Sequence, residues 1–211
     1  MTDAISKFQS RRQFLSKVIP VCAITCLGCN SALALSLNEN IDKVSQNDDD
    51  FQEKVPKDIS MHQLWEYRFK SNFIPVFKAI KDDIGSEKTL KILKKASSKN
   101  NFELGERFSK MRDVNDLSNF AEPFRNPREI FKQSFVYEII EDNNTVFEIK
   151  VTKCLTAKVF RESDAKDIGY AAVCYADYSL PEGFNSKIKL HRDQTLMNGD
   201  NCCNHRYTME G

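Results

Sequence analysis

The densest group of reactive side chains lies near the C-terminus, in the segment 197–207. It contains two adjacent thiols, Cys202 and Cys203, followed by the imidazole of His205 and the guanidinium of Arg206. A thiolate is a nucleophile, an imidazole moves protons near neutral pH, and a guanidinium binds carboxylates. These residue types together suit the hydrolysis of a small substrate, with Arg206 holding a carboxylate group of that substrate.

Two more residues capable of this chemistry, Cys174 and Asp177, lie upstream and are separated by two positions. In a catalytic interpretation, Cys203 or Cys174 is the nucleophile, while His205 or Asp177 carries the proton. Cys203 and His205 share one face of a β-strand, because the side chains of a strand alternate. An activated water is the other candidate nucleophile.

A metal centre is an alternative use of the same side chains. Cys154, Cys174 and Cys203, with His205 or Asp177, are suitable ligands for Zn²⁺ or Fe²⁺. A metal-bound water would then attack the substrate. The Cys-x₂-Cys spacing of a zinc knuckle is absent from the sequence.

A structural role is the third interpretation of the thiols. Residues 35–211 contain four cysteines, enough for two disulfides such as Cys154–Cys174. Free thiols buried as small apolar groups are equally consistent with the sequence. No particular pairing follows from it.

The composition limits the class of protein. The 211 residues are 41% apolar, which is sufficient for a packed core, and the net charge is +1. Residues 1–34 hold four basic side chains against Asp3, a balance of +3, so the remainder of the chain is close to −2. A domain that binds nucleic acid normally carries a basic face, and this balance argues against one.

The N-terminus resembles a twin-arginine export signal. The stretch Ser10-Arg11-Arg12-Gln13-Phe14-Leu15-Ser16-Lys17 precedes a short apolar run over 18–27, and Ala32-Leu33-Ala34 fits a cleavage site. Residues 1–34 are therefore predicted to be a signal peptide. Residues 35–58 are rich in Asn, Asp, Gln, Glu and Lys, which predicts a disordered polar linker.

Residues 59–211 are predicted to form one α+β domain. Apolar side chains recur at helical spacing from Met61 to Ile84, Ser60 can cap that helix, and Pro75 should kink it. Further helical segments extend to residue 120, with a break expected over 97–101. The remainder, 121–211, is predicted to be a four-stranded antiparallel sheet with one crossing helix, packed against the N-terminal helices.

The predicted sheet contains two hairpins. Segments 131–140 and 145–152 alternate around the turn at Asp142-Asn143-Asn144, and segments 187–196 and 203–209 flank the turn at Gly199. The crossing helix is expected over 164–177. We expect a pocket between this helix and the sheet.

Four short segments, in this order and at these spacings, together resemble one known family. They are Val151–Cys154, Phe160–Glu162, Cys174–Asp177 and Thr195–Tyr207. The family is that of L-2-amino-thiazoline-4-carboxylic acid hydrolase, and the similarity extends over residues 65–211. It implies hydrolytic opening of a cyclic isothiourea to N-carbamoyl-L-cysteine. The functional positions that it implies are Cys154, Cys174, Asp177, Gly199, Cys203 and Arg206.

The sequence therefore predicts a hydrolase that opens a small cyclic amidine or isothiourea, with Gly199 and Arg206 in substrate binding. The alternative is a non-enzymatic, exported domain that binds a metal or a small ligand. The Gly199-x-x-x-Cys203 ending supports this alternative, because it is similar to ligand-binding domains of the vinyl-reductase-associated type. The expected partners are a small-molecule substrate and the twin-arginine export machinery, without nucleic acid and with membrane contact only through the signal segment. The expected location is the periplasm or cell envelope.

Overall fold

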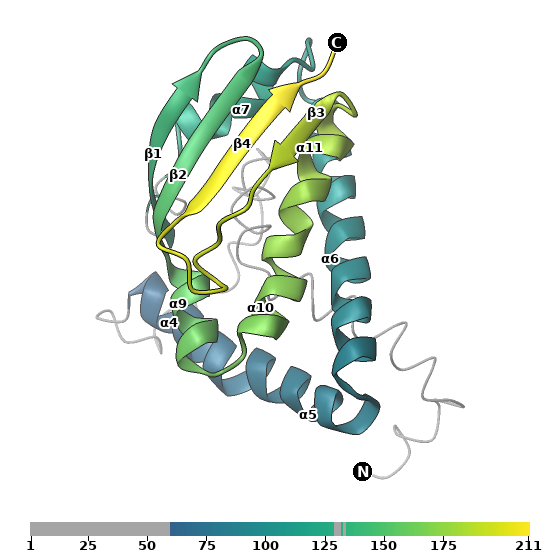
Figure 1. The fold of residues 1–211 in the computed structure, drawn as a ribbon, viewed down its shortest axis with the longest axis vertical. Helices are drawn as coiled ribbons and strands as arrows, with labels where there is room; N and C mark the ends of the chain where they lie inside the picture. The colour runs from purple at the N-terminus through teal and green to yellow at the C-terminus, as the bar shows by residue number, and fades with distance from the viewer. Residues whose placement is uncertain (1–59, 129–131, 133) are drawn as a thin grey trace, which may run out of the picture.

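The computed structural model describes residues 60–128, 132 and 134–211. The predicted signal peptide and linker lie outside these residues. Within them the predicted α+β class is confirmed, because helices pack against one four-stranded antiparallel sheet (Figure 1). No helix in the described part of the chain is long and apolar enough to span a bilayer.

The elements follow one another along the chain without repetition. The helical elements are α4 (Met61–Arg68), η2 (Phe69–Phe73), α5 (Ile74–Ile84), α6 (Ser86–Ser109), α7 (Leu117–Arg125), α9 (Leu155–Glu162), α10 (Lys166–Ala172), η3 (Cys174–Tyr178) and α11 (Ser179–Phe184). The strands are β1 (Phe135–Asp142), β2 (Val146–Cys154), β3 (Ile188–His191) and β4 (Cys203–Met209).

The first helical segment begins where the sequence predicts. Ser60 and Gln63 form a capping box, in which each side chain bonds to the backbone of the other residue. The chain stays helical past Pro75, which lies in the first turn of α5, where a missing N–H is tolerated. We expected a kink at this proline. The structure has instead a π-helical turn, η2, which ends two residues before Pro75.

The break expected over 97–101 is absent, and α6 runs without interruption for 24 residues. Ser97 is buried and donates a hydrogen bond of 3.0 Å to the carbonyl of Ala171 in α10, so its polarity serves helix packing. Farther along α6, Gly105 lies against α11, and a Cβ at this position would overlap the backbone of Leu180 and Phe184. The predicted break therefore lies on the side of α6 that contacts α10, and the same helix contacts α11 at Gly105.

The sheet has the strand order β1-β2-β4-β3, and every neighbouring pair is antiparallel. The last strand, β4, forms where the alternation predicts it, and so does the β1–β2 hairpin, except that β1 begins at Phe135 and includes Asp142 of the predicted turn. In β4, Cys203, His205 and Tyr207 are buried on one face, and Asn204 and Arg206 lie on the other. Strand β3 is shorter than expected and ends at His191.

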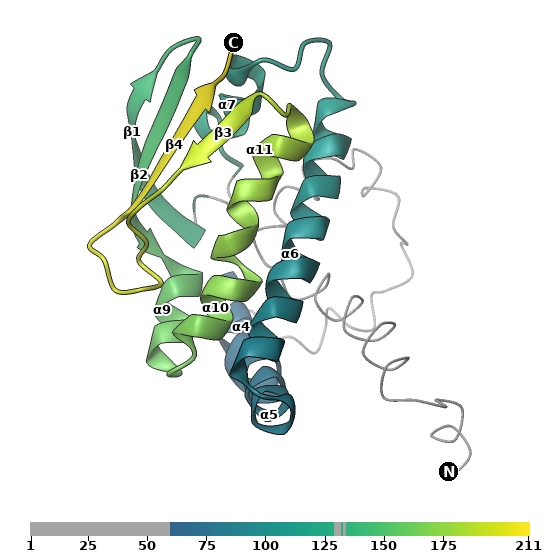
Figure 2. The same ribbon diagram turned by 45° about the vertical axis from the view of Figure 1, so that its right-hand side comes forward.

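The helices cover one face of the sheet in layers. Helix α11 lies between β3 and the long α6, α10 packs against α6 below the sheet, and α7 covers the upper part of the same face (Figure 2). Aromatic side chains fill the space between sheet and helices, including Phe120, Phe147, Phe184 and Tyr207. This buried face positions the candidate site.

Helices α9 and α11 were not predicted. Helix α9 follows β2 directly, and Cys154 is both the last residue of β2 and the N-cap of α9. Its sulfur accepts a hydrogen bond of 3.4 Å from the backbone N–H of Ala157. The helix contributes Val159 and Phe160 to a second core cluster that also contains Phe69 and Phe73.

Candidate active site

Three of the predicted thiols line one cavity with the imidazole and the carboxylate. The cavity has a volume of about 100 Å³ and lies between the inner face of the sheet and the segment 173–180, the position expected from the sequence. Its polar and sulfur-bearing walls are Cys154, Cys174, Asp177, Arg192, Cys203 and His205, with Tyr137, Thr156 and Tyr207. Its apolar walls are Phe124, Phe135, Ile149, Val151, Val173 and Leu180.

Strand pairing places Cys203 and His205 in the cavity wall. Cys203 is opposite Val151 of β2, and His205 is opposite Ile149, so both face the helices with these apolar residues. Asp177 comes from η3 on the facing side. The site therefore joins the sheet to the helical layer, and neither layer forms it alone.

Arg192 connects the polar groups of the cavity. Its Nη1 donates a hydrogen bond of 2.6 Å to Asp177 Oδ2 and another of 3.0 Å to His205 Nε2. Its Nη2 donates one of 2.7 Å to the carbonyl of Cys174. The Arg192 side chain is only 2% exposed, so these hydrogen bonds replace the water that its charge would otherwise require.

Nε2 of His205 is 3.0 Å from Arg192 Nη1 and 3.5 Å from Asp177 Oδ2, and we infer the tautomer from the shorter contact. A guanidinium can only donate, so Nε2 accepts, and in the neutral ring the proton lies on Nδ1. Nδ1 is buried and has no hydrogen-bond partner among the described residues. A buried donor without an acceptor is costly, so we expect a bound acceptor that reaches Nδ1–H to be favoured.

Asp177 remains ionised in this setting. Burial by itself raises the pKa of this carboxyl group, but the neighbouring His205 and Arg192 outweigh burial, so the pKa is lowered. Burial also opposes the charge of Arg192, yet the charge of Asp177 predominates and raises the pKa of the guanidinium. The cavity thus holds a fixed ion pair, with 32% of the Asp177 side chain still accessible.

The three cavity thiols are protonated near neutral pH. Burial raises the pKa of Cys154 to about 11, and it also raises the pKa values of Cys174 and Cys203. Cys203 Sγ is 3.2 Å from the N–H of Leu196 and 3.7 Å from Thr195 Oγ1. Among the described residues, no His or acidic side chain is hydrogen-bonded to any of these three sulfurs.

The side chain of Cys202 does not point into the cavity. Its sulfur donates to Gln194 Oε1 at 3.0 Å and does not line the cavity. Cys202 is nevertheless free, like Cys154, Cys174 and Cys203, so the structure contains neither of the disulfides that the structural interpretation allowed among these four.

The two predicted substrate-binding residues lie outside the cavity. Arg206 is on the opposite face of β4, where it is ion-paired with Glu141 at 2.7 Å and with Glu148. Strand alternation by itself places Arg206 on the face opposite Cys203 and His205, so the prediction of all three in one site was wrong for Arg206. Gly199 has φ +111° in the exposed turn before β4 and has no neighbour within 4 Å of a Cβ placed on it.

Arg192 was not among the residues predicted for the site. The sequence does contain an indication that Arg192 is buried, because the alternation of 187–196 places it on the same side as Ile188 and Leu190, which are buried. A charged residue on an apolar face requires a buried partner. Here that partner is Asp177.

The residues proposed for a metal centre, Cys154, Cys174, Cys203 and His205, line the cavity together. Nevertheless, no group of three or more His, Cys, Asp or Glu side chains within the described residues is arranged to hold a metal ion. The geometry of this cavity corresponds to an ion pair surrounded by neutral thiols.

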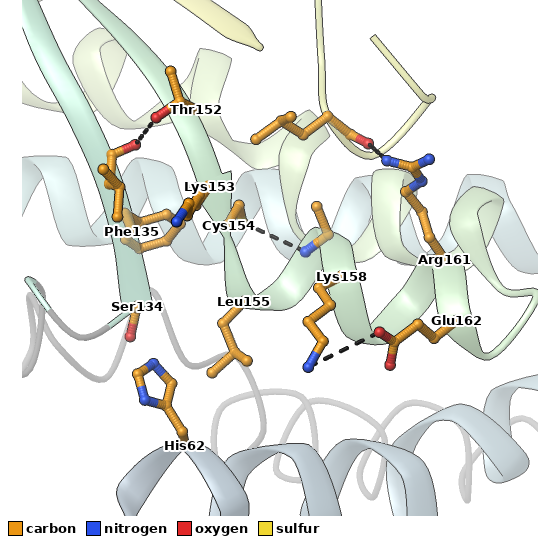
Figure 3. A pocket seen from close by; sticks show the side chains of 13 residues that line it. His62, Ser134, Phe135, Thr152, Lys153, Cys154, Leu155, Lys158, Arg161 and Glu162 are labelled. Carbon is orange, nitrogen blue, oxygen red and sulfur yellow. Dashed lines mark hydrogen bonds and ion pairs between the residues drawn. The ribbon is translucent and has the colours of Figure 1, made fainter. Parts of the chain in front are cut away.

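A wider groove of about 760 Å³ lies beside the cavity (Figure 3). It is formed by the start of β1, the end of β2, α9 and His62 of α4. Phe135 and Cys154 line both the groove and the cavity. Cys154 therefore belongs to the boundary between the two spaces.

The fold and the cavity define an α+β protein with a polar, thiol-lined site buried between a sheet and its covering helices. Residues 63–207 match the family of L-2-amino-thiazoline-4-carboxylic acid hydrolase, and the chain belongs to that family. No curated protein matches the sequence.

One similar solved structure is the crystal structure of a trafficking protein particle complex subunit 3 from Naegleria fowleri, covalently bound to palmitic acid. The sequence identity is 14% and the TM-score is 0.41, and the alignment covers 71% of this chain and 95% of the other.

Proposed function

We propose that this protein is a hydrolase that opens a small cyclic amidine or isothiourea, of the kind represented by L-2-amino-thiazoline-4-carboxylate. Family membership supports the reaction type. The observation that carries the proposal is the convergence of Asp177, Arg192, His205 and Cys203 on one buried cavity. Ring opening at an amidine carbon requires a base, an acid and oriented hydrogen-bond donors, and these four residues offer all of them.

The reaction adds one water across a carbon–sulfur bond. Water attacks C2 of the thiazoline and forms a carbon–oxygen bond. The bond between C2 and the ring sulfur then breaks, and the sulfur leaves as a thiolate that takes up a proton. The oxygen loses its two protons as the carbonyl of the urea forms: one balances the proton gained by the sulfur and the other goes to the ring nitrogen, which gives N-carbamoyl-L-cysteine with no other reagent.

We assign the role of base to Asp177. Its Oδ2 is held by Arg192, and its lowered pKa keeps the carboxylate ionised so that it can receive a proton from the attacking water. Arg192 is a positioning residue, because it fixes Asp177 and His205 through one nitrogen. Nδ1–H of His205 supplies a donor to the oxygen or nitrogen that gains negative charge at C2.

We assign the role of acid to Cys203. Its raised pKa keeps the thiol protonated, which suits a proton donor to the departing ring sulfur and is unfavourable for a resting nucleophile. Cys174 is the second candidate donor, because burial likewise keeps it protonated. In this scheme water is the nucleophile, in preference to a thiolate.

The test is turnover of L-2-amino-thiazoline-4-carboxylate by the purified protein, followed by appearance of the product thiol. Cys203→Ser and Asp177→Asn should each lower kcat by about 10²-fold or more, the range of general acid–base catalysis. Cys202→Ser is the matched control, because it changes the adjacent thiol outside the cavity and should retain activity. Absence of turnover by the unaltered protein, or equal activity of Cys203→Ser and Cys202→Ser, would refute these assignments.

A non-enzymatic ligand-binding domain is the second candidate function. The observation in its favour is that none of the cavity thiols is hydrogen-bonded to a basic side chain among the described residues. A protein of this kind would bind the thiazoline stoichiometrically without opening it. Calorimetry combined with the product assay distinguishes the two functions.

We also propose that the protein acts after export. The support is the Arg11-Arg12 signature with its following apolar run. Replacing both arginines with lysine should retain the protein in the cytoplasm, as measured by cell fractionation. Unchanged export of this double variant would rule out the twin-arginine route.

A further inference from the structure

The groove beside the cavity carries excess positive charge that the proposed hydrolysis does not use. Its charged walls are Lys153, Lys158, Arg161 and Glu162. Lys158 is 3.9 Å from Glu162 and 3.8 Å from Glu66, so its charge is partly balanced. Within the described residues, neither Lys153 nor Arg161 has an acidic partner.

Arg161 is nevertheless held in place. Its Nη1 donates to the carbonyl of Leu196 at 3.3 Å, which attaches the end of α9 to the segment before β4. The remaining guanidinium nitrogens keep their donors available to a bound molecule. Lys153 is exposed near the end of β2, and in Figure 3 Lys153 and Arg161 appear on either side of Cys154.

Apolar side chains form much of the remaining groove wall. They are Phe135, Val136, Leu155, Ala157 and Leu196. Low-dielectric walls strengthen the field of nearby cations, so a cleft of this kind concentrates anions at its surface. A volume of about 760 Å³ is also within the range of small-molecule sites.

We propose that this groove receives the substrate and that Lys153 and Arg161 recognise its carboxylate. The proposal rests on the proposed hydrolase function and gives Lys153 and Arg161 the recognition role that the sequence assigned to Arg206. The substrate then reaches the cavity at the shared wall formed by Phe135 and Cys154. The ligand class is a small heterocycle or amidine bearing one carboxylate.

The test compares each ligand with its methyl ester, which has the same ring and no negative charge. For turnover, kcat/KM is measured with L-2-amino-thiazoline-4-carboxylate and its ester. In the unaltered protein the carboxylate should be preferred. Lys153→Met and Arg161→Met should each reduce the ratio of the two kcat/KM values by roughly twofold to fivefold, and the double variant by about tenfold, as expected for partly exposed charge contacts.

Lys150→Met is the matched control, because it removes an exposed lysine of the same strand that lines neither space. It should leave the ratio unchanged. An unchanged ratio in the Lys153→Met/Arg161→Met double variant, with its fold verified by circular dichroism, overturns the inference.

Direct binding separates this inference from the proposed function. L-thiazolidine-4-carboxylate and its methyl ester lack the amidine carbon, so their binding can be measured by calorimetry without turnover. If the unaltered protein hydrolyses nothing, the proposed function fails. The groove inference then stands only if the carboxylate binds more tightly than the ester and the double variant abolishes the difference; equal binding overturns it.

Discussion

Arg192 Nη1 lies 2.6 Å from Asp177 Oδ2, and this buried ion pair connects the segment after β3 to η3. The same nitrogen lies 3.0 Å from His205 Nε2, so a single guanidinium orders both candidate proton-handling groups. The sequence assigned the functional guanidinium to Arg206, which instead forms ion pairs on the outer face of the sheet. The contrast between these two arginines provides a direct test of the site.

Arg192→Met should destabilise the protein strongly. It leaves Asp177 charged without its main partner, and breaking a buried pair in this way costs about 3–5 kcal/mol, here toward the lower end because Asp177 is partly accessible. Arg206→Met is the control, and a much smaller loss is expected because its ion pairs are exposed. Urea unfolding of both variants measures the difference. A greater loss for Arg206→Met would contradict the assigned burial.

The stability of the protein should fall at alkaline pH because of Cys154. Its pKa is about 11 in the folded state against an ordinary value of 9.0, so the unfolded chain releases this proton first as the pH rises. Stability from this thiol is thus complete below pH 9 and is lost between pH 9 and 11. A pKa difference of this size corresponds to a loss of roughly 2–3 kcal/mol.

Denaturant unfolding at a series of pH values measures this loss. Cys154→Ala and Cys154→Ser should both show a shallower alkaline decline than the unaltered protein. The serine variant retains an N-cap for α9, so it separates titration of the thiol from loss of the cap. If the decline of Cys154→Ser matches that of the unaltered protein, another group is responsible.

His205→Phe should separate activity from stability. The substitution keeps an aromatic ring beside Tyr207 and removes both the acceptor of the Arg192 hydrogen bond and the unpartnered Nδ1–H. The lost bond and the removed unsatisfied donor have opposite effects of similar size, so the free energy of unfolding should change by no more than about 1 kcal/mol. Turnover should fall by about 10²-fold.

The matched control for this prediction is His191→Phe. His191 is exposed on β3 and contacts Thr208 Oγ1 at 3.1 Å, away from the cavity. Steady-state kinetics and unfolding are measured for both variants. Equal activity of the two variants would remove His205 from the proposed chemistry.

Gly105→Ala should destabilise the fold although alanine favours helix. In an unconstrained helix the change would stabilise by about 1 kcal/mol. Here the added Cβ would overlap the backbone of α11 at Leu180 and Phe184, so a net loss of about 1–3 kcal/mol is expected. Glu106→Ala, on the exposed side of α6, is the control for thermal unfolding. A stabilised Gly105→Ala variant would show that α6 and α11 are not in close contact.

Local sequence patterns were sufficient to predict much of the fold. The Asp142-Asn143-Asn144 turn between two alternating segments indicated the β1–β2 hairpin, and alternation over 203–209 indicated β4. The turn-forming residues Ser97 and Asn101 predicted a break, but α6 continues through both of them. Their side chains are buried, and Ser97 meets the backbone of α10, a partner that no local window contains.

Part of the candidate site could also be predicted from local sequence. Cys154, Cys174, Asp177, Cys203 and His205 were all selected from residue type and spacing, and all five line the cavity. Arg192 and helix α9 were missed. Arg192 contributes through contacts with Asp177, His205 and the carbonyl of Cys174, which are distant in the chain. Helix α9 begins at the final residue of a strand, and the strand pattern concealed its N-cap.

By itself, the sequence determined which residues share a strand face, because alternation is a property of the backbone. It placed Cys203 and His205 together and, applied consistently, Arg206 opposite them. Only the tertiary structure decided which face is buried, which segment covers it and which guanidinium enters the cavity. These depend on contacts between residues distant in the chain, where a buried charge is stable only beside the partner that packing brings to it.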